Sequence, residues 1–199
     1  MPAAALVLGL AEVLSSLPAC PMGRASCIAI DLWVAESRLG KIGWVRSQLE
    51  AANEKLAVID AGVQVIAVHA LPESDLDVPD AAARDRLGRH GEQTPLRWFV
   101  VDRLVDLEEH GRERRGVTWR RAGGFYVIEA LSAWAPTLAH ELGHVLGLPH
   151  STEAASLMNK SVRAWPPFWK WGFTAREQPL MKKTLARLLG EKKLTRIAR

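Results

Sequence analysis

The segment from His140 to His150 carries the clearest chemistry in this chain. It reads His-Glu-Leu-Gly-His-Val-Leu-Gly-Leu-Pro-His, so three imidazoles and one carboxylate form the pattern H-E-x-x-H-x-x-G-x-x-H. On a helix with 3.6 residues per turn, His140 and His144 lie on one face, and their ring nitrogens can converge on one ion. The pattern therefore predicts one catalytic Zn²⁺ with His140, His144 and His150 as ligands and one open coordination position.

Glu141 and Gly147 support this interpretation. Glu141 is rotated by only about 100° from His140, so its carboxylate can reach a water on the metal without ligating the metal. It is expected to act as general base and then as general acid. Gly147 stands three residues after His144, where a helix that must stop and reverse needs a residue that tolerates positive φ.

Residues after the third histidine extend the motif into a resemblance to a family. Ser151 follows His150 directly, and Met158 stands eight residues after it. Together with the histidine motif, this resembles the metzincin zinc endopeptidases, and most closely their matrixin branch of the matrix-metalloproteinase type. In that family, a methionine turn forms an apolar floor under the imidazoles. The resemblance implies hydrolysis of peptide bonds by a zinc-bound water that the glutamate activates.

The chain departs from the family near the site. Matrixins usually place an aromatic residue and a proline after the turn methionine, whereas this chain has Asn159 and Lys160. Tyr126 is the only tyrosine, so the tyrosine ligand of astacins and serralysins has no counterpart. Transition-state charge is expected to rest on zinc, Glu141 and backbone donors. Two alternatives stay open: a zinc-binding protein of this fold that does not cut peptides, and an amide hydrolase of narrow specificity.

Hydrophobic patterning predicts the elements that must position this motif. Strand-like runs cover 27–34, 63–70 and 97–105, and residues 39–58 have apolar side chains at helical spacing. Residues 116–121 and 125–131 are expected to form a hairpin. The zinc-binding helix is expected from about 135 to 147, and Thr174-Ala175-Arg176-Glu177 is a capping-box pattern that opens a last helix.

This order of elements is similar to the metzincin domain. The resemblance implies an α+β fold, a metzincin-like zincin with a twisted mixed sheet of about five strands, one antiparallel edge strand and three main helices, with the zinc-binding helix at the centre. With 199 residues, 48% of them hydrophobic, the chain suits one catalytic domain. That domain is expected over 21–199, with a helix over about 174–190 and a basic tail over 191–199.

In metzincins, the edge strand binds substrate as an additional strand through backbone hydrogen bonds. Transferred to this chain, the strand is Gly116–Arg121. The alternative is a plain surface hairpin, whose arginines keep the edge from pairing with other chains. The residues that the resemblance implies as substrate contacts are Val117, Thr118, Trp119 and Arg120.

Aromatic residues gather after the methionine turn. In matrixins this stretch is the outer wall of the pocket for the residue after the scissile bond, which would favour an apolar or small side chain there. A simple cover for the core explains the aromatic residues equally well. The residues are Trp165, Phe168, Trp169, Trp171 and Phe173.

The first 20 residues resemble an export signal. Residues 2–19 look like a signal-peptide apolar region, and Leu17-Pro18-Ala19-Cys20 faintly resembles a lipobox, although Glu12 interrupts the apolar run. The segment is too short and too polar to cross a membrane. We expect a secreted or cell-envelope protein, with a cytoplasmic N-terminal helix as the alternative. The only cysteines, Cys20 and Cys27, form a disulfide after export unless Cys20 is lipidated.

Residues 71–95 correspond to a loop that binds structural zinc and calcium in matrixins. Asp75, Asp77 and Asp80 could supply oxygen ligands to Ca²⁺. The H-x-D pattern of the structural zinc is missing, however, and His90 has no evident partner. A solvated loop is therefore the expectation.

The chain has a formal net charge of +4. Nucleic-acid binding would need a known module or a basic stripe with stacking aromatic residues, and neither is evident. A peptide or protein substrate is the expected partner, and the sequence does not indicate an oligomeric state.

Overall fold

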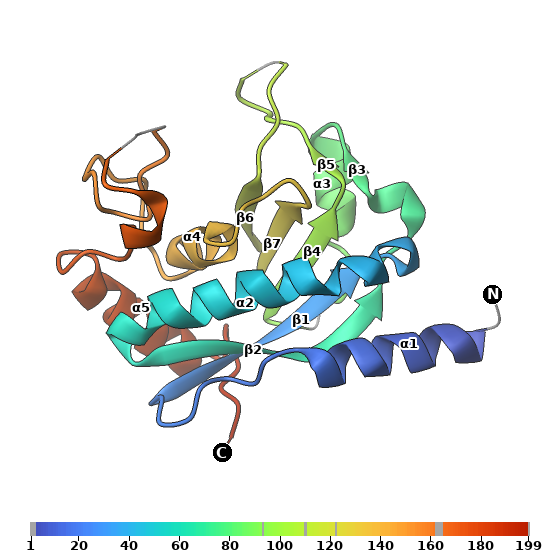
Figure 1. Ribbon diagram of the computed structural model, residues 1–199, viewed down its shortest axis with the longest axis horizontal. Coiled ribbons are helices and arrows are strands. Elements are labelled where there is room, and N and C mark those ends of the chain that lie inside the picture. Colours follow the sequence, from blue (N-terminus) through green and yellow to red (C-terminus); the bar gives the residue numbers. More distant parts are fainter. Residues whose placement is uncertain (1–2, 93, 110, 122, 162–164, 199) are drawn as a thin grey trace.

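A five-stranded sheet with the strand order β2-β1-β4-β7-β6 organises the chain (Figure 1). The structure, a computed structural model, describes residues 3–92, 94–109, 111–121, 123–161 and 165–198. The strands β1 (Ser26–Val34), β2 (Ala61–Ala70), β4 (Leu96–Val101) and β7 (Gly124–Ala130) are parallel, and β6 (Gly116–Arg121) is antiparallel to β7 at the sheet edge. The expected mixed sheet with one antiparallel edge strand is confirmed.

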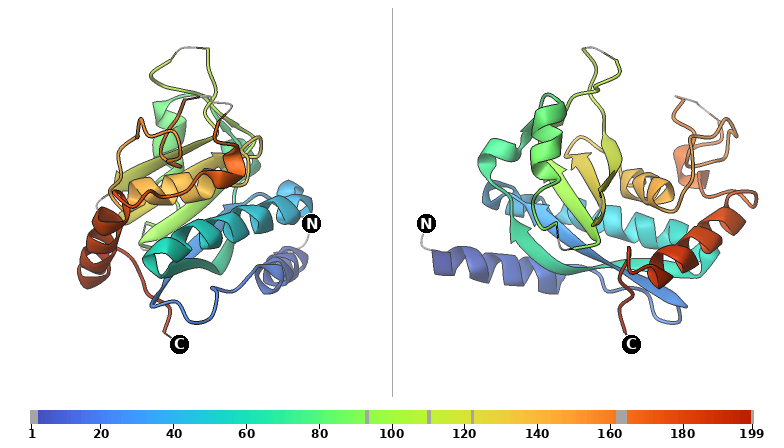
Figure 2. Two further views of the ribbon diagram at one scale, coloured as in Figure 1. Left: turned by 60° about the vertical axis from the view of Figure 1, so that its left-hand side comes forward. Right: turned by 180° about the vertical axis from the view of Figure 1, so that it is seen from behind.

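Helices cover both faces of the sheet (Figures 1 and 2). α2 (Ile42–Leu56), α4 (Thr137–Val145) and α5 (Gln178–Gly190) contribute to the main core on one face, and α3 (Ala81–Leu87) packs on the other face. α1 (Ala3–Ser16) lies beside β2. The remaining elements are the 3₁₀ turns η1 (Glu36–Lys41), η2 (Ala57–Ile59), η3 (Glu73–Asp75) and η4 (Phe168–Lys170), and the short strands β3 (Asp77–Val78) and β5 (Arg103–Leu104).

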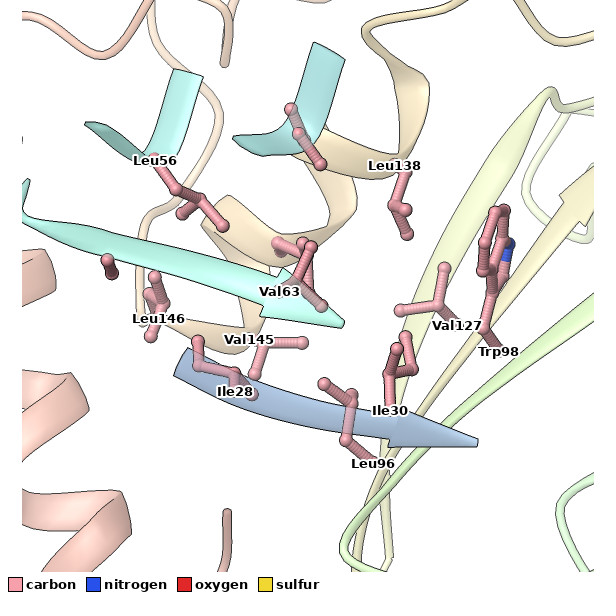
Figure 3. Packing of buried hydrophobic residues seen from close by; sticks show 14 of the residues in the cluster. Ile28, Ile30, Leu56, Val63, Leu96, Trp98, Val127, Leu138, Val145 and Leu146 are labelled. Carbon is pink, nitrogen blue, oxygen red and sulfur yellow. The ribbon is translucent and has the colours of Figure 1, made fainter. Parts of the chain in front are cut away.

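Alternating side chains of the strands divide the core into two layers. Ile30, Trp98 and Val127 point toward α2 and α4, where they meet residues such as Leu138 (Figure 3). Strand residues on the opposite face, among them Ile128, pack with α3. Because both faces are buried, the parallel strands read as nearly continuous apolar runs. The sheet thus forms a rigid platform for α4.

Two element boundaries differ most from the expected ones. The strand expected over 97–105 ends at Val101, because Asp102 turns away to bind Arg38 at 2.7 and 2.6 Å, and β5 then pairs with β3. The last helix begins at Gln178 rather than at Thr174. Only half of the capping box is present, since the Glu177 carboxylate accepts the Thr174 N–H at 2.7 Å, while the Thr174 hydroxyl has no partner in the described structure.

The expectation of a solvated loop over 71–95 is wrong, because the segment contains η3, β3 and α3. Asp75 is buried, and it accepts hydrogen bonds from Arg86 Nε and His90 Nε2, both at 2.8 Å. Burial alone would raise the pKa of Asp75, but these two hydrogen bonds outweigh it and lower the pKa. His90 therefore has a partner that sequence spacing could not show.

The three aspartates considered for calcium are all engaged by protein groups. Besides the Asp75 contacts, Asp77 pairs with Arg103 at 3.1 Å. Asp80 caps α3 by accepting the Ala83 N–H at 2.8 Å. Calcium binding at these residues stays a prediction.

The N-terminal segment packs against the domain. Leu14 and Leu17 lie against the main core, and Cys20 is disulfide-bonded to Cys27, which favours the first of the two alternatives for these cysteines. Disulfides persist mainly in oxidising compartments, and this agrees with the expected export. Over the described residues, no helix has the length and apolarity needed to span a bilayer.

Candidate metal centre

Three imidazoles meet at the end of α4. His140 and His144 lie on one face of the helix, and the chain returns after it to place His150 beside them. The ring centroids are 4.9 Å apart for His140 and His144, 4.8 Å for His144 and His150, and 5.6 Å for His140 and His150. One nitrogen of each ring lies within 4.8 Å of the others, and in the described part of the chain this is the one such group that could hold a metal ion.

Two backbone carbonyls determine which ring nitrogens face the centre. Nδ1 of His140 lies 2.8 Å from the Leu157 carbonyl, and Nδ1 of His144 lies 2.8 Å from the Leu148 carbonyl. An Nδ1–H that donates to a carbonyl leaves the Nε2 lone pair for a metal. Three imidazoles without a fourth protein ligand match the donor set of catalytic zinc, so the residues present fit that ion.

The electrostatic environment favours the neutral form of these imidazoles. Burial lowers the pKa of His140 to about 4. The Leu157 hydrogen bond raises this pKa in part, and the neighbouring His144 and His150 lower it further. Burial also lowers the pKa of His144. The pKa of His150 is lowered by burial and then by the neighbouring His144 and Lys160. Neutral imidazole is the form that ligates a metal.

Glu141 lies buried between α4 and the edge strand. The Thr118 hydroxyl of β6 donates to Glu141 Oε2 at 2.7 Å. Burial raises the pKa of Glu141 to about 7, although the Thr118 hydrogen bond lowers it in part. A carboxylate that titrates near neutrality is suited to taking and returning a proton.

Gly116 provides the space for this carboxylate. A Cβ at position 116 would lie only 2.7 Å from Glu141 Oε1, so a larger residue would displace the glutamate. Neither Gly116 nor the Thr118 contact was singled out as part of the site by sequence reasoning. A glycine opening an otherwise β-rich strand is the one signal that could have suggested a close approach.

Met158 packs under α4, as the expected methionine turn requires. Its side chain is fully buried, and a Cβ on Gly143 of α4 would collide with its Sδ atom. Sequence reasoning did not single out Gly143. Because glycine within a helix costs about 1 kcal/mol relative to alanine, its presence there is a sign of such close packing.

The turn after α4 has the predicted geometry. Gly147 has φ of +89°, which confirms the expected positive φ. The Leu148 N–H donates to the Gly143 carbonyl at 2.9 Å and closes the helix end. This reversal carries the chain to His150, whose side chain is exposed at the cleft.

A buried serine anchors the methionine turn. The Ser156 hydroxyl donates to Glu177 Oε1 at 2.6 Å and accepts the Met158 N–H at 3.0 Å. The Leu157 N–H donates to the Gly172 carbonyl at 2.8 Å. These bonds position the Leu157 carbonyl that orients His140. The glutamate stands 21 residues after the serine, so no local pattern indicated this contact.

An open cleft of about 1490 Å³ runs past the three histidines. One wall is β6, whose outer edge has no neighbouring strand in the described sheet. Of the four residues proposed from the sequence as substrate contacts, Val117, Thr118 and Arg120 line the cleft. Trp119 points away from it and stacks against the Arg84 guanidinium at 3.8 Å.

Three tryptophans also line the cleft. Trp171 is buried in the main core and packs edge to face with Trp134 at 5.0 Å. Trp169 is 64% exposed, and all three of these indoles line the cleft. The aromatic stretch therefore covers the core and shapes the cleft at once.

The fold and the site together resemble those of metzincins: a mixed sheet with an antiparallel edge strand, a helix bearing H-E-x-x-H, a third histidine and a buried methionine after it. Residues 92–167 match the matrixin family model, a segment that contains β4, β6, β7, α4 and the methionine turn. Over this segment the chain is therefore matrixin-like.

Solved structures share the fold. Metalloproteinase-II from Bacteroides fragilis is similar with a TM-score of 0.52 at 16% identity over 88% of this chain, which spans 60% of that chain. A zinc-dependent peptidase from Methanocorpusculum labreanum strain Z has a TM-score of 0.50 at 15% identity, covering 77% of this chain and 99% of its own. No curated protein sequence matches the chain.

Proposed function

We propose that the chain is a zinc-dependent endopeptidase. The observation that carries this proposal is the convergence of three neutral imidazoles beside a buried glutamate that the edge strand holds at the cleft. The matrixin match and the metalloproteinases of similar fold support it. The ligands would be His140, His144 and His150, with Met158 packed beneath them.

Glu141 is the general base and then the general acid in this proposal. Zinc held by the three histidines would supply Lewis acidity to a water and to a peptide carbonyl in the site. Glu141 takes the proton from that water as the water oxygen bonds to the carbonyl carbon, and passes it to the amine nitrogen as the C–N bond breaks. The Thr118 hydrogen bond keeps the carboxylate at one position during both transfers.

The substrate is proposed to lie along β6 as an additional antiparallel strand. The outward N–H and C=O groups of this edge strand can pair with an extended peptide of any sequence. Thr118 and Arg120 face the cleft on the same side as Glu141. Backbone pairing then brings a peptide bond past the glutamate, as endopeptidase activity requires.

We also propose that the protein works outside the cytoplasm. The Cys20–Cys27 disulfide supports this location. Mass analysis of the N-terminus of the native protein tests whether the segment before Cys20 is removed, which would leave the disulfide intact. An intact N-terminus on protein recovered from the cytoplasm would contradict export.

Digestion of unfolded casein by the zinc-loaded protein tests the proposed activity. Glu141→Gln should retain one zinc per chain and lose roughly 10²- to 10⁴-fold in kcat/KM, the usual contribution of a general acid–base group. Glu50→Gln, at an exposed position of α2, is the matched control and should cut at the wild-type rate.

Two outcomes would contradict the proposal. If wild-type protein binds one zinc but cuts neither casein nor a random peptide library, it is a binding protein of this fold. If it cuts only a very small set of amides, the narrow amide hydrolase is the better description.

A further inference from the structure

Positive side chains outnumber carboxylates along the cleft. They come from β6, from the segment before it, from the residues after the methionine turn and from α5. The cations are Arg112, Arg114, Arg115, Arg120, Lys160 and Arg187; the carboxylates other than Glu141 are Asp106, Glu109 and Glu113.

Ion pairs account for all of these carboxylates. The pairs are Arg112 with Glu109, Arg114 with Asp106 and Glu108, Glu113 with Arg103, and Arg187 with Glu191. Arg115, Arg120 and Lys160 remain, and none of the three has a carboxylate partner within the described ranges of the chain. The cleft therefore carries positive charge that the protein itself does not neutralise.

These three cations line the same cleft as Glu141. Arg115 directly precedes β6, and Arg120 lies near its other end, about 17 Å further along an extended strand. Thr118, which contacts Glu141, lies between them. Lys160 follows the methionine turn and also lines the cleft, close enough to His150 for its charge to lower the pKa of that imidazole.

All three cations are accessible to a ligand in the cleft. Arg120 and Lys160 are exposed, and Arg115 is exposed with its guanidinium 5.7 Å from the Trp134 ring, another cleft residue. Uncompensated charges on the walls of a concave site raise the local concentration of oppositely charged ligands.

We propose that the cleft selects peptides with aspartate or glutamate side chains on both sides of the scissile bond. This inference rests on the proposed endopeptidase function and names its substrate class. A peptide paired along β6 passes Arg115 and Arg120 at its two ends, and Lys160 lines the same cleft. Acidic side chains gain ion pairs at these positions, and basic ones are repelled.

Matched fluorogenic peptides test the preference. They share one apolar core around the scissile bond and carry acidic, neutral or basic residues on both sides. An exposed ion pair contributes up to roughly fivefold, so engagement of two or three cations predicts about a 10- to 100-fold higher kcat/KM for the acidic peptide than for the basic one. Raising NaCl from about 50 mM to about 300 mM should reduce this ratio, because salt screens exposed charges.

Substitutions that change the charge of Arg120 and Lys160 test whether these residues cause the preference for acidic peptides. The double variant Arg120→Gln/Lys160→Gln should lose most of the preference, and Arg120→Glu/Lys160→Glu should reverse it. Lys182→Glu/Lys183→Glu makes the same change of net charge on exposed positions of α5 outside the cleft, and should keep the preference. Equal cleavage of the three peptides by wild-type protein, or an equal shift in the α5 control, would overturn the inference.

Binding to zinc-loaded Glu141→Gln separates this inference from the proposed function. Fluorescence anisotropy with the same peptides should show tighter binding of the acidic one even where no bond is cut. If wild-type protein cuts nothing but the acidic peptide still binds tightest, the endopeptidase proposal fails and the charge selection stands. Equal binding of all three peptides, or no binding, overturns the charge selection.

Discussion

Replacing Glu129 with glutamine should stabilise the protein, and by more as the pH rises. Glu129 lies on β7 with its side chain fully buried. Neither of its oxygens has a partner in hydrogen-bonding geometry within the described structure. Burial raises its pKa well above the ordinary value of 4.5, and the charge of Glu141 adds to the rise, while the nearby Trp98 indole offsets a part of it.

The sign follows from proton binding. Between the unfolded pKa of 4.5 and the raised folded pKa, the native state holds more protons than the unfolded state. The free energy of unfolding therefore falls as the pH rises through this window, by up to about 1.4 kcal/mol per pH unit. The contribution of Glu129 to the free energy of unfolding is fully present below the unfolded-state pKa. It is lost as the pH rises through the folded-state pKa. Glutamine has nearly the same shape and does not titrate, so the variant lacks this slope.

Urea unfolding, followed by tryptophan fluorescence with zinc in excess, measures the difference. The gap between Glu129→Gln and wild type should widen by up to about 1.4 kcal/mol per pH unit between about pH 5.5 and about pH 7.5. In a domain of this size, that corresponds to about 3–6 °C in Tm. Glu50→Gln makes the same chemical change at an exposed position of α2 and serves as the control. A gap that stays constant with pH would refute the reasoning, because a simple packing effect does not depend on pH.

Two further predictions concern packing and the N-terminal linkage. Gly143→Ala should destabilise the protein by about 1–3 kcal/mol, since the alanine Cβ would collide with Met158 Sδ. Thermal unfolding and casein cleavage measure the effect. An unchanged Tm would contradict the prediction, because it would show that the methionine side chain moves freely. Replacing Cys20 and Cys27 with serine removes a short covalent loop and should lower the free energy of unfolding by about 2–3 kcal/mol. Neither cysteine lines the cleft, so the kcat/KM of the folded variant should stay unchanged. A loss of activity would contradict the prediction that the disulfide serves stability alone.

The parts of the site that depend on local geometry could be predicted from the sequence. The four-residue spacing of His140 and His144 places them on one helix face whatever the rest of the chain does. Gly147 marked the helix end because few other residues tolerate its φ of +89°. The mixed sheet with one antiparallel edge strand followed from the resemblance, since buried strands of this kind carry little information about their neighbours.

Contacts across long stretches of sequence could not be predicted. The Thr118–Glu141 hydrogen bond joins residues 23 apart, and His90 meets Asp75 only because α3 folds back on the sheet. Such pairings depend on strand register and on loop paths, which composition and periodicity do not encode. The burial of the Glu129 carboxyl could not be predicted either, because the sequence does not show whether a single glutamate in an apolar run faces water.

The two departures from the matrixin pattern gain a physical meaning from the structure. Asn159 braces the turn, with its side-chain amide donating to the Glu153 carbonyl at 3.2 Å and its oxygen accepting the Ser161 N–H at 2.9 Å. The next residue, Lys160, is left exposed at the cleft. An aromatic residue and a proline at these positions would form an apolar wall, whereas this chain places a cation beside His150. In the proposed function, the three histidines and Glu141 would serve any peptide. Substrate choice would then depend on wall residues such as this lysine, and the charge-reversal variants test that division directly.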